Sequence, residues 1–112
     1  MKVSAELIEK IKDMLTVYVC PELQQAAKDF LDCAEKTGEA DPSVLIAELR
    51  EDIRTIDDYI EFTQSEYCIN MNDEIVSQLM YKQGLEAKEK GAVNCLCPGC
   101  TRAAAVLAEL TE

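Results

Sequence analysis

Apolar side chains recur every three or four residues along most of the chain, which is the spacing of amphipathic helices. Ser4 suits the N-cap of a first helix, and Pro21, Pro42 and Pro98 suit the first positions of later ones. Gly38 ends the second helix, because glycine readily adopts the left-handed conformation of a C-terminal cap. The apolar positions of the first two helices are Leu7, Ile8, Ile11, Met14, Leu15, Tyr18, Leu23, Ala26, Ala27, Phe30, Leu31 and Ala34.

The middle of the chain allows two interpretations. Residues 42–65 keep the helical spacing throughout, so they form either one long helix or two helices separated near Thr55. We favour the break, because threonine is a good N-cap for a new helix. The stretch 65–71 is loop-like, and Asn72 is expected to cap a long helix that Gly84 weakens.

No segment alternates between apolar and polar residues in the way a half-buried strand does. The predicted fold class is therefore all-α, a compact bundle of five or six short helices with no sheet. A chain of 112 residues is long enough to bury one core. Residues 1–112 are thus expected to form a single helical domain, with a cluster of cysteines at the start of the last helix.

Charge and composition exclude several classes of function. The chain has 22 acidic and 11 basic side chains, a net charge of −11, which excludes nucleic acids and anionic membranes as partners. It has no histidine, which excludes the usual Ser-His-Asp and Cys-His catalytic systems and zinc sites with histidine ligands. The sequence shows neither a membrane-spanning apolar run nor a signal peptide, so we expect a cytoplasmic protein with reduced thiols.

Three cysteines, Cys95, Cys97 and Cys100, lie within six residues where a loop leads into the last helix. Cys97 is expected at the N-cap, where the helix dipole stabilises a thiolate and lowers its pKa below the usual value of about 8.5. Cys20 also precedes a proline at a helix start, and the two helix N-termini together would help to keep the thiolates ionised. The four thiols of Cys20, Cys95, Cys97 and Cys100 form a metal-ligand set suited to structural zinc, with an iron–sulfur cluster as second choice.

Two other interpretations of these thiols stay open. One is a dithiol oxidoreductase, with Cys97 as the attacking thiolate and Cys100 as the resolving thiol. The thioredoxin setting for such a pair needs βαβ elements, which the sequence does not predict, and we assign no enzymatic activity. The other is a set of thiols without a role. Cys33 and Cys68 are expected to be core-packing residues, with Cys68 as a reserve metal ligand.

Three stretches resemble those of a family of short bacterial all-helical proteins with a C-terminal C-x-C-P-x-C motif. They are Cys20 with Glu22-Leu23-Gln24-Gln25-Ala26-Ala27, Glu51-Asp52-Ile53 with Ile56-Asp57, and Gly91-Ala92-Val93-Asn94-Cys95-Leu96-Cys97-Pro98-Gly99-Cys100. Members of that family often carry a label as heat-shock proteins or molecular chaperones. The resemblance covers residues 20–110 and implies cysteines at the four proposed ligand positions, but no established activity. Gly99 and Thr55 depart from the pattern, in which alanine and proline are usual.

The sequence thus predicts a small cytoplasmic helical protein with a metal–thiolate site that is structural or senses metal or redox state. We expect it to act through a protein partner or by self-association, and an acidic surface suits a basic partner.

Overall fold

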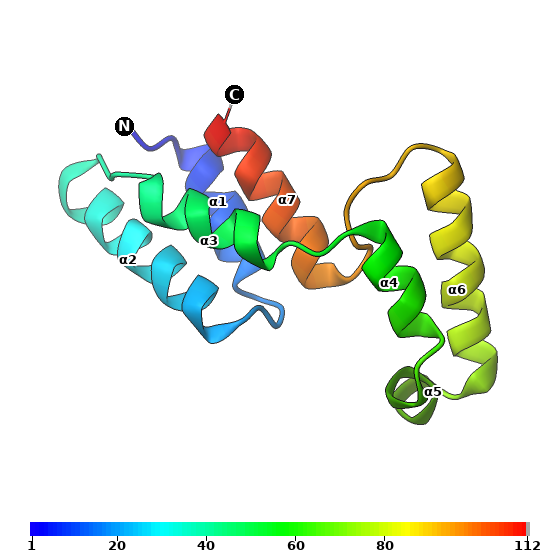
Figure 1. The fold of residues 1–112 in the computed structure, drawn as a ribbon. Helices are drawn as coiled ribbons and strands as arrows, with labels where there is room; N and C mark the ends of the chain where they lie inside the picture. The colour runs from blue at the N-terminus through cyan, green and yellow to red at the C-terminus, as the bar shows by residue number, and fades with distance from the viewer. Residues whose placement is uncertain (112) are drawn as a thin grey trace. The chain divides into compact units, whose positions relative to one another are not determined.

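The computed structural model describes residues 1–111, and these residues form seven α-helices with no strand among them (Figure 1). Their contacts divide the chain into two compact units. The first unit contains Met1–Ile53 and the last helix, and the second contains Arg54–Cys97. The helices are α1 (Ala5–Met14), α2 (Pro21–Thr37), α3 (Ser43–Asp52), α4 (Ile56–Thr63), α5 (Glu66–Asn72), α6 (Glu74–Glu89) and α7 (Pro98–Thr111).

The all-α prediction is confirmed over the described residues, but the number of helices is seven rather than five or six. The additional helix is α5, in the stretch that we expected to be a loop. Its N-cap is Ser65, whose side chain accepts a hydrogen bond from the backbone N–H of Cys68. The next helix is capped by Asp73 rather than by Asn72, because Asn72 is the last residue of α5. No helix of the described residues is long and apolar enough to cross a membrane.

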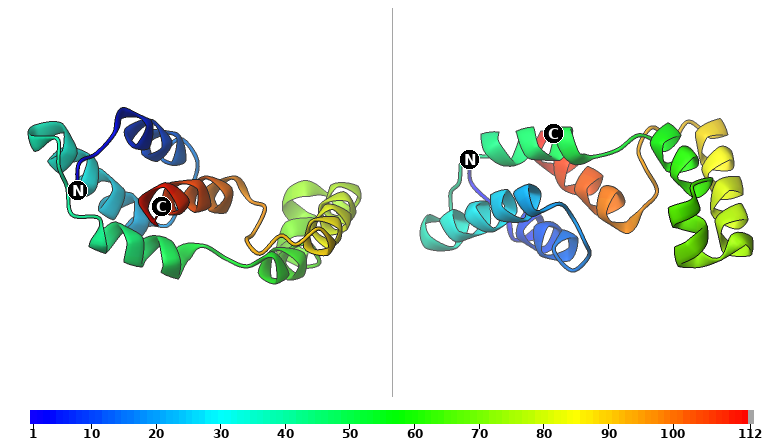
Figure 2. Two further views of the ribbon diagram at one scale, coloured as in Figure 1. Left: turned by 90° about the horizontal axis from the view of Figure 1, so that it is seen from above. Right: turned by 60° about the horizontal axis from the view of Figure 1, so that its bottom comes forward.

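The first unit packs α1 against α7 and α2 against α3, and α3 also contacts α7 (Figure 2). Two of its helix ends follow the expected chemistry, whereas Pro42 is the N-cap of α3 rather than its first residue. The Ser4 side chain accepts from Leu7 N–H, and Gly38 takes the left-handed conformation at φ 75°. The core side chains are Leu7, Ile11, Met14, Val19, Leu23, Ala26, Ala27, Phe30, Leu31, Ala34, Ala40, Leu45, Leu49, Ala103, Val106 and Leu110.

The break near Thr55 is confirmed, since α3 ends at Asp52 and α4 begins at Ile56. Thr55 and Asp58 form a capping box at this start. The Thr55 hydroxyl accepts from Asp58 N–H at 3.1 Å, and the Asp58 carboxylate accepts from Thr55 N–H at 3.2 Å. The backbone N–H of Thr55, and after it the Thr55 side chain, hold the pKa of the Asp58 carboxyl below its usual range.

Replacing Thr55 by alanine should remove one of these two bonds. We expect Thr55→Ala to lower the free energy of unfolding by about 1 kcal/mol, the typical cost of losing an N-cap side chain. Urea denaturation of the two proteins measures the difference. Gln64→Ala is the matched control, because Gln64 is exposed at the other end of α4, and it should change stability by less than about 0.5 kcal/mol.

The second unit packs α6 against both α4 and α5. Gly84 lies buried on α6, where an added Cβ would come within 2.9 Å of the Ile60 side chain and 3.2 Å of the Tyr59 ring. The glycine that the sequence marks as a weak point therefore allows α4 to approach α6 closely. The buried side chains of this unit are few, and two of them are polar: Ile56, Tyr59, Thr63, Cys68, Ser77 and Cys95.

Candidate metal centre

The thiols of Cys95, Cys97 and Cys100 form a cluster in which all three sulfur atoms lie within 4.8 Å of one another. The three residues span only six positions, so this proximity is a local property of the chain. Cys95 and Cys100 are nearly buried, at 6% and 9% exposure, and Cys97 is half-buried. Three of the four residues predicted as metal ligands are therefore brought together.

Backbone pairing within the second unit holds Cys95. Its N–H donates to the Arg54 carbonyl at 2.8 Å, and two residues earlier the Val93 carbonyl accepts from Ile56 N–H at 2.8 Å. Thr55 and Asn94 pair between these two bonds. The Cys97 N–H in turn donates to Cys95 Sγ at 3.4 Å. A backbone donor directed at sulfur stabilises the charge of a thiolate, and so favours the form that binds metal.

Cys100 lies in the first turn of α7, which begins at Pro98 as predicted. Within the first unit this turn is close to the segment before α2: a Cβ at Gly99 would lie 2.6 Å from the Tyr18 carbonyl oxygen. Arg102 is held on α7 by the Pro98 carbonyl, which accepts from Nη1 at 3.3 Å, and by Asp13, whose Oδ2 lies 3.3 Å from Nε. Arg102 therefore serves the contact between α7 and the C-terminal end of α1.

Cys20 is not in this three-thiol cluster. It is the N-cap of α2, as predicted, and its thiol donates a hydrogen bond to Asp52 Oδ2 at 2.9 Å. Burial and then the Asp52 carboxylate raise the pKa of Cys20 to about 11. The helix N-terminus was expected to keep this thiol ionised, whereas burial and the acidic neighbour favour its protonated form. The sequence did not identify Asp52 as the hydrogen-bond partner of Cys20, because the two residues meet only through the packing of α2 on α3.

The Cys20 pKa leads to a pH-dependent prediction. Because the pKa is raised to about 11, the folded state holds this proton more tightly than the unfolded state. The resulting stabilisation is complete below the ordinary pKa of a cysteine thiol and is lost as the pH rises through about 11.

We expect Asp52→Asn to lower the pKa of Cys20 without restoring it fully, since burial is the larger cause. The rate of Cys20 alkylation against pH, followed by peptide mass spectrometry, should shift to lower pH in the variant. Alkylation of the exposed Cys33 provides the internal reference and should not shift. An unchanged Cys20 profile would show that Asp52 does not control this thiol.

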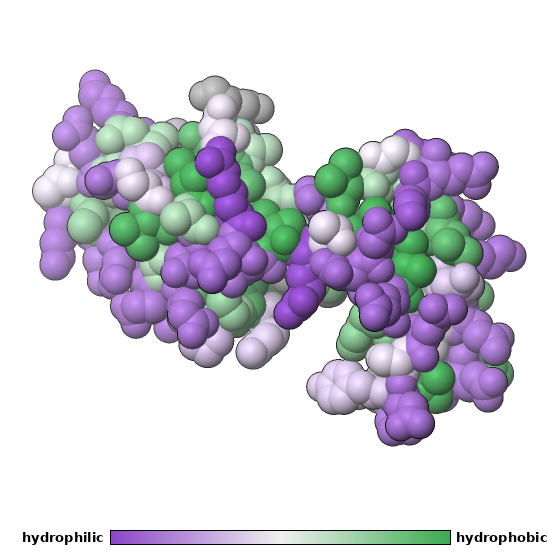
Figure 3. Space-filling model, viewed as in Figure 1, coloured by the Kyte–Doolittle hydropathy of each residue, from purple (hydrophilic) through white to green (hydrophobic). Residues whose placement is uncertain are grey.

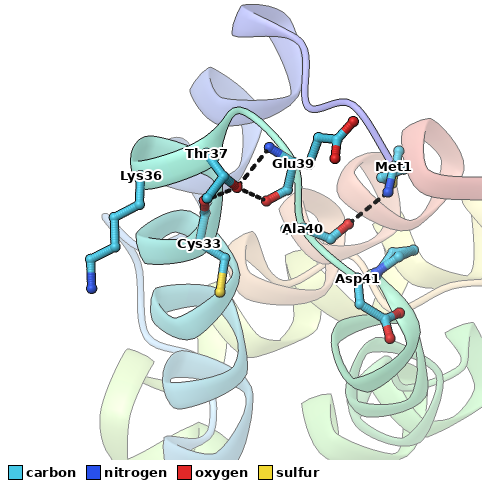
Figure 4. A pocket seen from close by; sticks show the side chains of 8 residues that line it. Met1, Cys33, Lys36, Thr37, Glu39, Ala40 and Asp41 are labelled. Carbon is cyan, nitrogen blue, oxygen red and sulfur yellow. Dashed lines mark hydrogen bonds between the residues drawn. The ribbon is translucent and has the colours of Figure 1, made fainter.

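The two remaining cysteines differ from each other. Cys68 is fully buried and its sulfur lies 3.4 Å from Ser77 Oγ, which confirms its place in a core. Cys33 is exposed, so the expectation of core packing is wrong for it. It borders an open depression of about 510 Å³ beside residues 36–42 and Met1 (Figure 4). The reason is the helical register of α2, whose buried side is taken by Phe30, Leu31 and Ala34.

The cluster fits a thiophilic metal ion. A tetrahedral zinc site with Zn–S bonds of about 2.3 Å requires sulfur atoms about 3.8 Å apart. Sulfur atoms within 4.8 Å of one another are at most about 1 Å farther apart than this spacing. The three cysteines could therefore hold a metal ion, and this set contains only sulfur donors, which favour zinc, copper(I) or iron over magnesium and calcium.

Comparison with known proteins adds no assignment: no protein-family model, no curated protein and no solved structure matches this chain.

Proposed function

We propose that this chain binds zinc through Cys95, Cys97 and Cys100, with Cys20 as the fourth ligand. The observation that carries the proposal is the three-thiol cluster within 4.8 Å. Local backbone bonds already order Cys95, and the Cys97 N–H already donates to its sulfur. An iron–sulfur cluster is the second choice of cofactor, because it uses the same ligand type.

The fourth ligand requires a change at Cys20. Its thiol must lose a proton and leave Asp52 Oδ2 to join the other sulfur atoms. Two contacts within the first unit support its recruitment. The Tyr18 carbonyl lies against Gly99, one residue before Cys100, and the Gln24 side chain holds the same turn by donating to the Val19 carbonyl at 2.9 Å. Zinc binding then competes with Asp52 for the thiol and becomes tighter as the pH rises.

A structural role for the metal follows from the composition of the second unit. Arg54–Cys97 is a small piece of chain whose buried apolar side chains are Ile56, Tyr59, Cys68 and Cys95. Pieces of about 40 residues usually need a metal, a disulfide or a partner to complete their stabilisation. Zinc bound at Cys95 would provide it, because binding to the folded state alone adds directly to stability.

A dithiol activity is the second candidate, and the proximity of the Cys97 and Cys100 sulfurs at the start of α7 favours it. In that case the Cys97 thiolate attacks a disulfide substrate and forms a mixed disulfide as the first product thiol leaves. Cys100 then attacks the Cys97 sulfur, which releases the second product thiol and leaves a Cys97–Cys100 disulfide. This activity does not need Cys20 or Cys95. Cys20→Ser and Cys95→Ser should therefore retain it, whereas both substitutions should weaken zinc binding.

In the zinc proposal the protein works in the cytoplasm, where thiols stay reduced, as a metal-dependent structural or sensing protein with a protein partner.

Cobalt(II) in place of zinc tests the ligand count, because the intensity of sulfur-to-cobalt absorption rises with each thiolate. Cys20→Ser should remove about a quarter of that intensity if four thiolates bind. Equal intensity with and without Cys20 would reduce the site to three thiolates, and the absence of these bands from the wild type would overturn the site.

A further inference from the structure

Large apolar side chains are exposed in one stretch of the second unit. Of the thirteen large apolar side chains exposed in the described residues, seven lie between positions 62 and 79. They include Ile75 at 72% exposure and Tyr67 at 65%. Figure 3 shows hydrophobic side chains open among hydrophilic ones on one face of this unit. The seven are Phe62, Tyr67, Ile69, Met71, Ile75, Val76 and Leu79. More than half of the exposed large apolar side chains thus fall in 18 consecutive residues, whereas surface apolar groups are usually scattered singly.

Five of these side chains are related by contact or by helical spacing. The rings of Phe62 and Tyr67 lie 6.1 Å apart, centroid to centroid. Tyr67 and Met71 are one turn apart on α5, and Ile75 and Leu79 are one turn apart on α6, so each pair shares a face of its helix. We call these five residues the exposed apolar set. They lie on α4, α5 and α6, which pack against one another.

The inward side of α6 is already occupied, which leaves Ile75 and Leu79 for a partner. At 100° per residue, the buried Ser77 and Gly84 lie on the side of α6 roughly opposite Ile75 and Leu79. On α5 the buried residue is Cys68, which lies about 100° from Tyr67 and about 60° from Met71, and both of these side chains are nevertheless exposed. All five side chains of the exposed apolar set are therefore accessible on the surface of the unit.

The charged side chains of the segment that carries the exposed apolar set are all acidic. Residues 55–81 contain no lysine or arginine. They contain six acidic side chains, all of them exposed: Asp57, Asp58, Glu61, Glu66, Asp73 and Glu74. Asp57 is paired with Lys88 at 2.6 Å, Asp58 belongs to the capping box, and Asp73 accepts from Val76 N–H as the N-cap of α6. The carboxylates of Glu61, Glu66 and Glu74 are interleaved in sequence with the exposed apolar set. A second copy of the chain would bring the same acidic groups, whereas a cationic partner would complement them.

We propose that the exposed apolar set binds a cationic amphipathic helix of another protein. The apolar side chains of such a helix, spaced three or four residues apart, would pack on Tyr67, Met71, Ile75 and Leu79. Its lysine or arginine side chains would face the surrounding carboxylates. Aromatic and methionine side chains favour this use, because they are enriched at interfaces and adapt to varied apolar partners.

A synthetic leucine–lysine peptide with helical spacing of its leucines serves as the probe, and the full chain is used throughout. Fluorescence anisotropy of the labelled peptide should show saturable binding that weakens at higher salt. A scrambled peptide of the same composition should bind at least about tenfold more weakly, since it loses the apolar face. Equal binding of the scrambled peptide would reduce the interaction to non-specific charge attraction and overturn the proposal.

The matched variants separate this surface from the rest of α6. Ile75→Gln with Leu79→Gln should weaken peptide binding at least about tenfold, whereas Leu85→Gln should change it less than about twofold. Leu85 is also exposed on α6, at 43%, but lies on a different side of the helix. Circular dichroism should be the same for all, because the three side chains are exposed. Equal peptide binding by the double variant and the wild type would overturn the proposal. The proposal would also be overturned if sedimentation showed that the wild type dimerises and the double variant does not, because the exposed apolar set would then bind a second copy of the chain.

Discussion

Replacing Cys95 by serine should abolish the stabilisation that zinc gives to this protein. At free zinc about a hundredfold above the dissociation constant, binding to the folded state adds about 2.7 kcal/mol to the free energy of unfolding. Cys95→Ser should lose nearly all of this increment, because a serine hydroxyl is a poor ligand for zinc. Urea denaturation with and without zinc measures the increment for each protein.

The test compares the gain in the free energy of unfolding that zinc produces in each protein, and not the free energies of unfolding themselves. Cys95 is 6% exposed, so a serine hydroxyl at this position also weakens the second unit in the absence of metal. Cys33→Ser is the matched control, since Cys33 is an exposed thiol on α2 and should keep the full zinc increment. If Cys95→Ser kept the increment of the wild type, Cys95 would not be a ligand.

Gly99→Ala should destabilise the protein even though it places a better helix former in α7. Helix propensity alone would favour alanine by about 1 kcal/mol. An alanine Cβ would lie 2.6 Å from the Tyr18 carbonyl oxygen, and a backbone atom cannot rotate away as a side chain can. Overpacking costs about 1–3 kcal/mol, and a 2.6 Å contact with a backbone atom lies in the upper part of this range. After the gain in helix propensity is subtracted, we expect a net loss of about 1–2 kcal/mol in the free energy of unfolding.

The same substitution should weaken zinc binding, because the displaced turn carries Cys100. Thr101→Ala is the control, since Thr101 is exposed in the same turn and its replacement should change stability by less than about 0.5 kcal/mol. A Gly99→Ala protein as stable as the wild type would show that the Tyr18 segment moves aside without cost.

The helix boundaries that the sequence predicted correctly are those set by local chemistry. Ser4, Cys20-Pro21, Gly38, Thr55 and Pro98 each act through hydrogen bonds or backbone angles within a few residues. Helix α5 was missed because it is only seven residues long and its burial depends on Cys68 meeting Ser77 of α6. Such a contact between separate helices leaves no periodic signal in so short a segment.

The features of the candidate site also fall into two groups: those that follow from local spacing along the chain and those that depend on the packing of separate helices. Cys95, Cys97 and Cys100 were found because their proximity follows from spacing along the chain. The hydrogen bond from Cys20 to Asp52 joins residues 32 positions apart and depends on how α2 packs on α3. Its consequence, a thiol whose pKa is raised rather than lowered, could not be obtained from the helix start alone. The close approach at Gly99 is likewise a property of the folded first unit.

The most direct test of the zinc site is the metal content of the full chain, purified without oxygen or chelator. We predict about one zinc ion per chain and no visible colour, with loss of the metal after replacement of Cys95, Cys97 and Cys100 by serine. Iron with acid-labile sulfide would replace zinc by a cluster at the same cysteines. Absence of bound metal, even after reconstitution of the reduced protein with zinc, would contradict the account.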